Sequence, residues 1–339
     1  MPEVSVVIPS YNHAAYLGEA VRSVLSQTHQ DLELIVVDDG SGDNSLEILQ
    51  KFADPRLKVI SQSNQGAHVA INRGLHTATG EYLAVLNSDD VYLPGRLEKL
   101  LAAMKAEPAG ALAGSHIEII DDQGRTLGVK HGYHDCPPWP LEDEGRSFRS
   151  GDDLHAALLT ENYYATTSNF IFPRRLFEQV GDFRPLRYVH DWDFALRLAN
   201  RGKLLLLPEP LMRYRLHGKN TIRENQAAMV FEICWTLAIH LPEQAAALGF
   251  TNENPAWRTD QLLYSIHVAG CERALSVLLA YRLHENILLA LQLLDPQDNV
   301  RQQFIDFIAS QLTVRGDEKL PWGDRLRHRL HQLKNCLRL

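Results

Sequence analysis

The stretch VSVVIPSYN (residues 4–12) opens with a continuous apolar run, Val4–Ile8, which Pro9 is expected to break before polar residues follow. The same pattern recurs in LELIVVDDGS (residues 32–41) and YLAVLNSDD (residues 82–90). Unbroken apolar runs of this length are typical of strands buried on both faces of a parallel sheet. Between the first two runs, apolar residues from Leu17 to Leu25 recur at helical spacing. Strands that alternate with helices predict an α/β fold with a mixed, mainly parallel sheet.

Weaker patterns extend this framework along the chain. A further strand is expected at Leu57–Ile60, and Asn44 with Glu47 has capping-box spacing for a helix. Pro94 is expected to open another helix, because proline suits the first helical turn. Later short strands are expected at Ile117–Ile120, Phe170–Phe172 and Leu204–Leu207, with an inserted loop over His131–Ser150. We expect an α/β domain over residues 1–220 and a helical region over 221–339.

The polar residues cluster where predicted strands end. Ser10 follows the first strand, Asp38 and Asp39 the second, and Asp89 and Asp90 a later one. Ligands of parallel sheets bind beyond the carboxyl ends of the strands, so we expect these ends to converge on one crevice. Adjacent carboxylates suit Mg²⁺ or Mn²⁺, which take oxygen ligands. Acidic residues are also common as solvated turn formers, and that alternative stays open for both pairs.

Bulk composition narrows the function classes. The chain has 339 residues, 45% of them hydrophobic and 22% charged, which is typical of a globular protein. Its net charge of −8 argues against nucleic acid as a partner, because such binding needs a basic footprint.

The sequence favours a cytoplasmic protein with reduced thiols. No basic and apolar export signal follows Met1, and the most apolar stretch, Ala274–Leu294, is interrupted by charged residues. The cysteines are far apart and show no metal-ligand spacing. They are Cys136, Cys234, Cys271 and Cys336.

Taken together, these motifs resemble the family 2 glycosyltransferases of the GT-A fold. The resemblance is carried by residues 4–12, by VVDDGS (36–41) and by NSDD (87–90). Intervening motifs fit the same pattern, and they are NQG (64–66), AINRG (70–74) and TGEY (79–82). The resemblance covers about residues 3–217, and it implies an enzyme that uses a nucleotide-sugar donor.

The resemblance also implies a donor nucleotide site. Pro9 and Tyr11 would line the nucleobase pocket, and Asp39 would accept a hydrogen bond from uracil, with Asp38 supporting that loop. Asp89 would lie near the ribose or the metal. Arg73 would contact phosphate or a neighbouring acid, and an exposed helix arginine is the equally weighted alternative.

Metal binding is implied at two positions. Asp90 would hold a divalent cation, Mn²⁺ or Mg²⁺, that bridges the donor diphosphate. His217, in the motif YRLH (214–217), would reach the metal or the diphosphate, and a purely structural histidine is the alternative.

The motif HDWD (190–193) resembles the family's Glu-Asp motif and implies that Asp191 is the general base. Such a carboxylate would take the proton of the acceptor hydroxyl. His190 stands where the family has glutamate. Asp191 could also cap a helix running to Asn200, and Trp192 suits either the floor of the acceptor site or the core.

We therefore predict an inverting, metal-dependent transferase that moves a sugar from a UDP-sugar to an acceptor hydroxyl. The acceptor would be a saccharide or lipid-linked saccharide, in surface polysaccharide or glycoconjugate biosynthesis. A nucleotidyltransferase would want a glycine-rich basic loop where Pro9–Asn12 stands, and a nicotinamide-dependent enzyme would want GxGxxG there. A sugar-nucleotide-binding or scaffold protein without catalysis stays open.

The C-terminal stretch Asp324–Leu339 has leucines on one helical face and basic residues around it. One hypothesis is a peripheral contact with anionic lipid at the inner face of the cell membrane. Packing against the protein or against a second copy in a homo-oligomer is the alternative.

Overall fold

The computed structural model describes residues 1–132, 154–218, 220–221, 224–244 and 291–313. All but the first two residues of the predicted loop His131–Ser150 lie outside these ranges, as does the predicted helix Asp324–Leu339. Cys234 is buried, and the other three cysteines lie outside the described ranges.

The described strands form one nine-stranded sheet in the order β3-β2-β1-β4-β8-β6-β9-β5, with β7 added beside β6. Their bounds are β1 (Val4–Ser10), β2 (Leu32–Asp38), β3 (Leu57–Ser61), β4 (Tyr82–Val85), β5 (Val91–Tyr92), β6 (Gly110–Ile120), β7 (Thr126–Lys130), β8 (Ile171–Pro173) and β9 (Lys203–Arg215). Strands β1 to β4 run parallel, as predicted. Strand β8 runs antiparallel to β4 and β6, which makes the sheet mixed.

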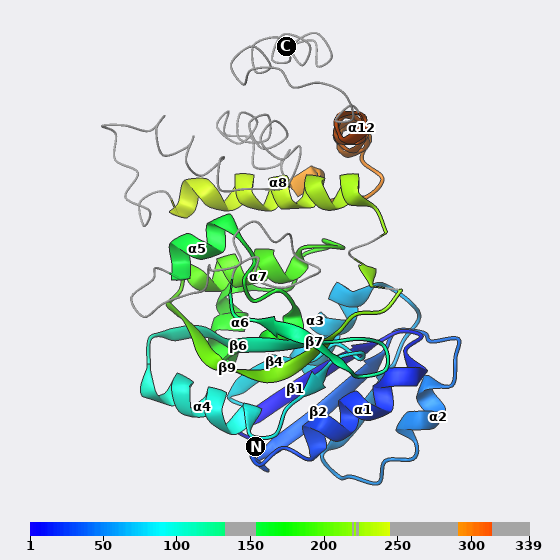
Figure 1. Cartoon of the computed structure of the whole chain (residues 1–339), viewed down its shortest axis with the longest axis vertical. Helices are drawn as coiled ribbons and strands as arrows, with labels where there is room; N and C mark the ends of the chain where they lie inside the picture. The colour runs from blue at the N-terminus through cyan, green and yellow to red at the C-terminus, as the bar shows by residue number, and fades with distance from the viewer. Residues whose placement is uncertain (133–153, 219, 222–223, 245–290, 314–339) are drawn as a thin grey trace.

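Helices cover both faces of the sheet (Figure 1). Their bounds are α1 (Ala14–Leu25), α2 (Ser45–Leu49), α3 (Ala67–Thr77), α4 (Arg96–Ala106), α5 (Leu154–Thr160), α6 (Arg174–Val180), α7 (His190–Ala199), α8 (Gln226–Gln244) and α12 (Asn299–Thr313). A short 3₁₀ helix, Thr167–Asn169, precedes β8.

Side chains that alternate along the buried strands belong to two hydrophobic cores, one on each face of the sheet. Val7 of β1 belongs to the core that contains residues of α3 and α7, whereas Val6 and Ile8 belong to the core with α1 and α4. Successive side chains of a strand point to opposite faces, so a continuous apolar run supplies both cores.

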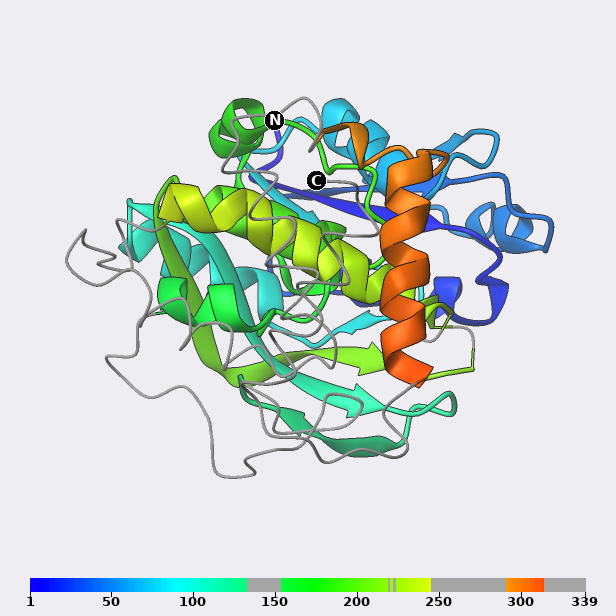
Figure 2. The ribbon, with the colours of Figure 1, turned by 90° about the horizontal axis from the view of Figure 1, so that it is seen from above.

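Helix α8 packs directly on the α/β layer. Its residues Phe231 and Trp235 belong to the same core as Phe194 of α7. Figure 2 shows α8 and α12 lying across one another over this face. The hydrophobic core of the described residues is therefore continuous across residue 220, and the predicted division into two regions there stays a prediction.

Local expectations at element ends need correction. Strand β1 continues through Pro9, which pairs with Val37, because the β4 ladder on its other side stops at Val7. Asn44 makes no side-chain cap, and the Asp43 carboxylate instead accepts a hydrogen bond from the Ser45 N–H at 3.0 Å. Helix α4 begins two residues after Pro94, behind Gly95 at a positive φ of 78°.

Candidate functional site

The carboxyl ends of β1, β2 and β4 meet at one edge of the sheet, as predicted. Ser10 pairs with Asp38 at the ends of β1 and β2, and the Asp39 N–H donates to the Ser10 carbonyl at 2.8 Å. From the β4 side, the Ser88 hydroxyl lies 2.8 Å from Nδ1 of His13. The predicted convergence of the polar strand ends is confirmed.

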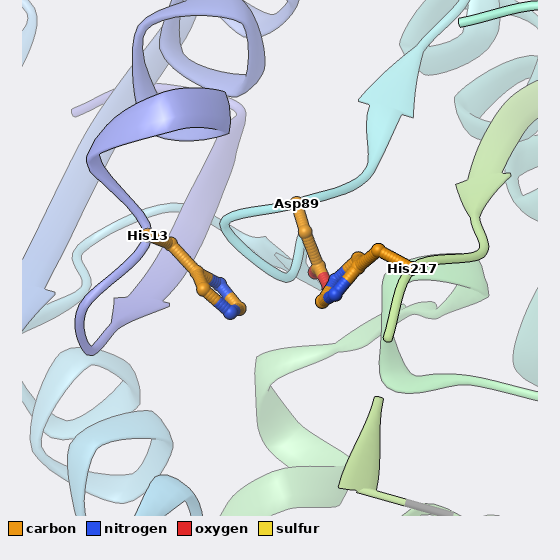
Figure 3. A group of neighbouring side chains, drawn as sticks. All are labelled: His13, Asp89 and His217. Carbon is orange, nitrogen blue, oxygen red and sulfur yellow. The ribbon is translucent and has the colours of Figure 1, made fainter. Parts of the chain in front are cut away.

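A group with the chemistry of a metal site lies at this edge. His13, Asp89 and His217 each offer one ligand atom, and these atoms lie within 4.8 Å of one another. Figure 3 shows the three side chains directed into one space from three separate segments. Nε2 of His217 is 2.9 Å from Oδ2 of Asp89. Imidazole nitrogens suit divalent transition metals and carboxylates suit Mn²⁺, so this donor set fits such an ion better than it fits Mg²⁺.

Neighbouring side chains hold this group in place. The Tyr16 ring stacks on His217 with 5.2 Å between centroids, and the Arg215 guanidinium lies 4.9 Å from the Tyr16 centroid. Arg215 also donates from Nε to the Asp89 carbonyl at 2.9 Å and pairs with Glu19 at 2.7 Å. Helix α1 and the end of β9 are thereby fixed against the turn of residues 87–90, called the acidic turn below because it contains Asp89 and Asp90.

Asp90, the predicted metal ligand, does not belong to this group. Its carboxylate is buried and accepts hydrogen bonds from the Ser168 hydroxyl at 2.5 Å and the Arg215 N–H at 3.0 Å. Burial, reinforced by the charge of Asp89, holds the pKa of Asp90 well above its usual range. The adjacent residue Asp89 belongs to that group, and the metal role of Asp90 stays a prediction.

His13 is not among the residues predicted from the sequence. The residue directly follows the Asn12 motif at the end of β1, which is a position that faces the site. That position was the available signal, but its partner His217 is distant in the chain, and no local spacing joins them.

Asp38 and Asp39 hold the loops beyond the end of β2 through hydrogen bonds. The Asp39 carboxylate accepts hydrogen bonds from the Gly66 N–H at 2.8 Å and the Gln62 side chain at 2.7 Å, which fixes the loop before α3. Asp38 accepts from the Ser41 N–H at 3.1 Å. Oδ2 of Asp38 and the Ser10 hydroxyl are buried without a hydrogen-bond partner among the described residues. Such orphaned groups are uncommon in native proteins, and they suggest that a polar ligand binds at these strand ends.

The remaining predicted donor residues are more exposed. Tyr11 is 47% exposed at the end of β1, and Pro9 is half-buried. Arg73 is an exposed residue of α3 whose guanidinium donates to the Gln62 side chain at 2.9 Å. Their contacts with a nucleotide stay predictions.

Asp191 lies in the first turn of α7 and is only 7% exposed. Its Oδ1 accepts from the Trp192 N–H at 2.7 Å, and its Oδ2 accepts from the Asn162 amide at 3.0 Å. Burial raises the pKa of Asp191 to about 7. The N-cap position belongs to Val189, and the helix ends at Ala199, so Asp191 is not the N-cap residue.

Of the two neighbours of Asp191, Trp192 belongs to the hydrophobic core and His190 is half-buried. Trp192 is buried, and its indole N–H donates to the Leu158 carbonyl at 2.7 Å, which supports the core interpretation of this residue. His190 lies 3.2 Å from the Leu186 carbonyl through Nδ1, and burial lowers its pKa.

One segment, residues 162–168, joins Asp191 to the acidic turn. It begins with Asn162, which bonds Asp191, and ends with Ser168, which bonds Asp90. In between, Thr166 accepts a hydrogen bond from the Asn87 amide at 3.0 Å, and Ala165 has a positive φ of 66°. A non-glycine residue in that region is strained, and such strain is frequent at functional sites. Sequence analysis did not identify this segment, which has no charged residue or glycine to mark it.

The pattern that defines glycosyl transferase family 2 matches residues 5–181. The chain belongs to this family. By family it is a glycosyltransferase, as its motifs predicted. An uncharacterized glycosyltransferase of Nostoc sp. is 34% identical over 226 residues, which are 64% of this chain and 66% of that protein.

Solved structures show the same fold. S. aureus TarS 1-349 in complex with UDP-GlcNAc is similar with a TM-score of 0.55 at 17% identity, covering 78% of this chain and 72% of that one. The mannosyltransferase PcManGT of Pyrobaculum calidifontis, in complex with GDP-Man and Mn²⁺, has a TM-score of 0.51 at 17% identity, covering 93% and 88%. The predicted GT-A fold is confirmed.

None of the helices in the described ranges combines the length and apolar character that crossing a bilayer would need.

Proposed function

We propose that this glycosyltransferase moves a sugar from a nucleoside-diphosphate donor to an acceptor hydroxyl, with inversion at the anomeric carbon. The observation that carries the proposal is the linkage of two groups at one sheet edge. The His13–Asp89–His217 group and the Asp191 carboxyl are joined through the acidic turn and residues 162–168. One group suits the diphosphate leaving group, and the other suits the attacking hydroxyl.

Asp191 is the proposed general base. Its ionised carboxylate takes the proton of the acceptor hydroxyl while that oxygen bonds to the anomeric carbon and the bond to the diphosphate breaks. The Asn162 amide, 3.0 Å from Oδ2, orients the carboxylate. One base and no second nucleophile among the predicted site residues favour a single displacement, which inverts the anomeric centre.

His13, Asp89 and His217 are the proposed ligands of a divalent cation. When bound, the cation supplies positive charge to the diphosphate as it leaves. Mn²⁺ is the proposed ion, because imidazole and carboxylate donors suit it and because PcManGT binds Mn²⁺ together with GDP-Man.

Uridine is the proposed donor base. Support comes from the sequence motifs around Tyr11 and Asp39 and from the UDP-GlcNAc bound to TarS. The acceptor stays a prediction, as a saccharide or lipid-linked saccharide in polysaccharide or glycoconjugate assembly. The cytoplasmic location, the membrane contact and the homo-oligomer also stay predictions.

Calorimetric titration of UDP, and separately of GDP, tests the donor and metal assignments. We expect UDP to bind in the presence of Mn²⁺ and to bind weakly in EDTA. Asp89→Asn is expected to lose the Mn²⁺-dependent gain, whereas the control Asp122→Asn, which changes an exposed carboxylate, keeps it. Tighter binding of GDP would replace the uridine assignment, and equal affinity in EDTA would contradict the metal site.

Sugar transfer tests the enzymatic part separately. Asp191→Asn is expected to bind UDP as the wild type does and to lose roughly 10²- to 10⁴-fold in kcat. Binding without any turnover by the wild-type protein, across a panel of donor sugars and saccharide acceptors, would favour a sugar-nucleotide-binding protein.

A further inference from the structure

Helix α8 carries a buried carboxylate, Glu232, that belongs neither to the His13–Asp89–His217 group nor to the loops held by Asp38 and Asp39. Glu232 is fully buried, and its two oxygens accept hydrogen bonds from consecutive backbone N–H groups of one turn. The Arg187 N–H is 3.1 Å from Oε1, and the Tyr188 N–H is 2.8 Å from Oε2. Burying a carboxylate is costly unless it is paired, so Glu232 needs a counter-charge as well as these two hydrogen bonds.

The counter-charge comes from α12. Arg301 is buried and donates to Oε1 of Glu232 at 2.9 Å. Its other guanidinium nitrogen donates to the Leu293 carbonyl at 3.1 Å. The pair therefore has its charge balanced and its hydrogen bonds shared between α8, α12 and the turn that Glu232 holds.

That turn leads directly into the first turn of α7. Arg187 and Tyr188 precede His190, where the helix begins, and Asp191 follows at once. Anchoring the two N–H groups fixes the direction in which the chain enters α7. The orientation of the Asp191 side chain depends on that direction, because it projects from the first helical turn.

A second attachment to α8 lies just beyond Asp191. Asp193 is fully buried, and its Oδ1 lies 2.9 Å from Nε2 of His240 in α8. Arg184 and Arg197 pair with the same carboxylate at 2.7 and 3.0 Å. Asp191 therefore stands between two buried attachments to the C-terminal helical region, one on each side in the sequence.

We infer that Glu232 is a positioning residue for sugar transfer, through which helices α8 and α12 hold Asp191 in its reactive orientation and away from water. This inference rests on the proposed role of Asp191 as general base. The C-terminal helices are then a working part of the active site, because they anchor the turn that presents the base.

The environment of Asp191 gives the inference a specific signature. Its raised pKa results from burial, and the hydrogen bonds from the Trp192 N–H and the Asn162 amide oppose that rise. Nearby charges are already paired, Asp193 with Arg184, Arg197 and His240, and Glu232 with Arg301. A loosened turn would admit water to Asp191, and its pKa would then fall toward the ordinary range.

The test is Glu232→Gln in the full chain, assayed for transfer from the UDP-sugar that the wild type uses. Glutamine keeps the size of the side chain but offers an NH₂ group to one of the two backbone N–H groups. We expect kcat to fall on the order of 10- to 100-fold, the cost of a small misplacement, with the donor KM within about twofold. The acid limb of the kcat profile should also move to lower pH. An unchanged kcat with an unchanged pH profile would overturn the inference.

Glu224→Gln is the matched control. Glu224 pairs with the Arg187 side chain at 2.7 Å on the exposed surface and leaves the backbone N–H groups of that turn untouched. We expect it to match the wild type. If Glu232→Gln does not fold by circular dichroism, Glu232→Asp, which keeps the charge but shortens the reach, replaces it with the same expected and contradicting results.

Asp191→Asn separates failure of the inference from failure of the proposed function. If Asp191→Asn is inactive while Glu232→Gln behaves as the wild type, the base assignment stands and the positioning role falls. If Asp191→Asn turns over as the wild type does, the base assignment falls, and the positioning role falls with it.

Discussion

At the scale of single residues, four aspartates of the site have four different surroundings. Asp39 fixes a loop through the Gly66 N–H, and Asp89 faces His217 at 2.9 Å. Asp90 is buried and accepts a hydrogen bond from Ser168, and Asp191 is buried and accepts one from Asn162. Side-chain chemistry is identical in all four, so burial and hydrogen-bond partners assign their roles.

We expect the transfer rate to depend on the ionisation of Asp191. Burial raises its pKa to about 7, and only the ionised carboxylate accepts a proton. Below that pH the protonated fraction grows, so kcat should fall about tenfold per pH unit, and above it kcat should level off. A pH–rate profile measured between pH 5 and 9 checks this. The residual rate of Asp191→Asn should not show this fall at low pH, and a flat wild-type profile would contradict the assignment.

At the scale of elements, the layers pack closely enough that glycines are required at particular contacts. Helix α3 crosses β1 at Gly74, where an added Cβ would lie 2.3 Å from Cγ1 of Val7. Helix α1 also contains a glycine, Gly18, but an added Cβ there would make only ordinary contacts at 3.5 Å. Close approach to the sheet positions α3, whose first turn lies beside the Asp39 loop.

Alanine substitutions at these two helical glycines should change the free energy of unfolding in opposite directions. Gly74→Ala should lower the free energy of unfolding by about 1–3 kcal/mol, because the methyl group overpacks the contact with β1. Gly18→Ala should raise it by roughly 0.5–1 kcal/mol, because alanine loses less backbone entropy in a helix. Urea unfolding of both variants measures the difference. Equal destabilisation by the two would contradict the packing argument.

At the scale of the whole molecule, the candidate cation site exists only in the folded chain. His13 precedes α1, Asp89 follows β4 and His217 follows β9, so the unfolded chain keeps the three apart. A ligand that binds only the native state stabilises it by mass action. Binding of a divalent cation at this candidate site is therefore expected to stabilise the fold.

We expect Mn²⁺ at a hundred times its Kd to raise the free energy of unfolding by about 2.7 kcal/mol. EDTA should reverse the gain, and His13→Ala should reduce it by weakening the site. His76→Ala removes an exposed histidine of α3 that is not a member of the group, so it should keep the full gain. Chemical unfolding with and without Mn²⁺ measures the shift, and a gain that survives in His13→Ala would exclude that residue as a ligand.

Local sequence patterns predict the order of strands and helices in the first half of the chain and the edge of the sheet that carries the candidate site. An apolar run predicts a buried strand, and the polar residues after the run predict where that strand ends. Proline and capping signals were less reliable, since Pro9 stays within β1 and Asp43, not Asn44, bonds the start of α2.

Which of these side chains come into contact depends on how the whole chain packs. The tertiary structure turned Asp89 toward the cation group and buried Asp90, although the two are adjacent, because the backbone of the turn and the contacts of Ser168 and Arg215 settle the direction of each side chain. It also brought His13 to His217 and Glu232 to the turn before α7. These contacts join segments that are distant in the chain, so they form through packing of the whole molecule and leave no local pattern in the sequence.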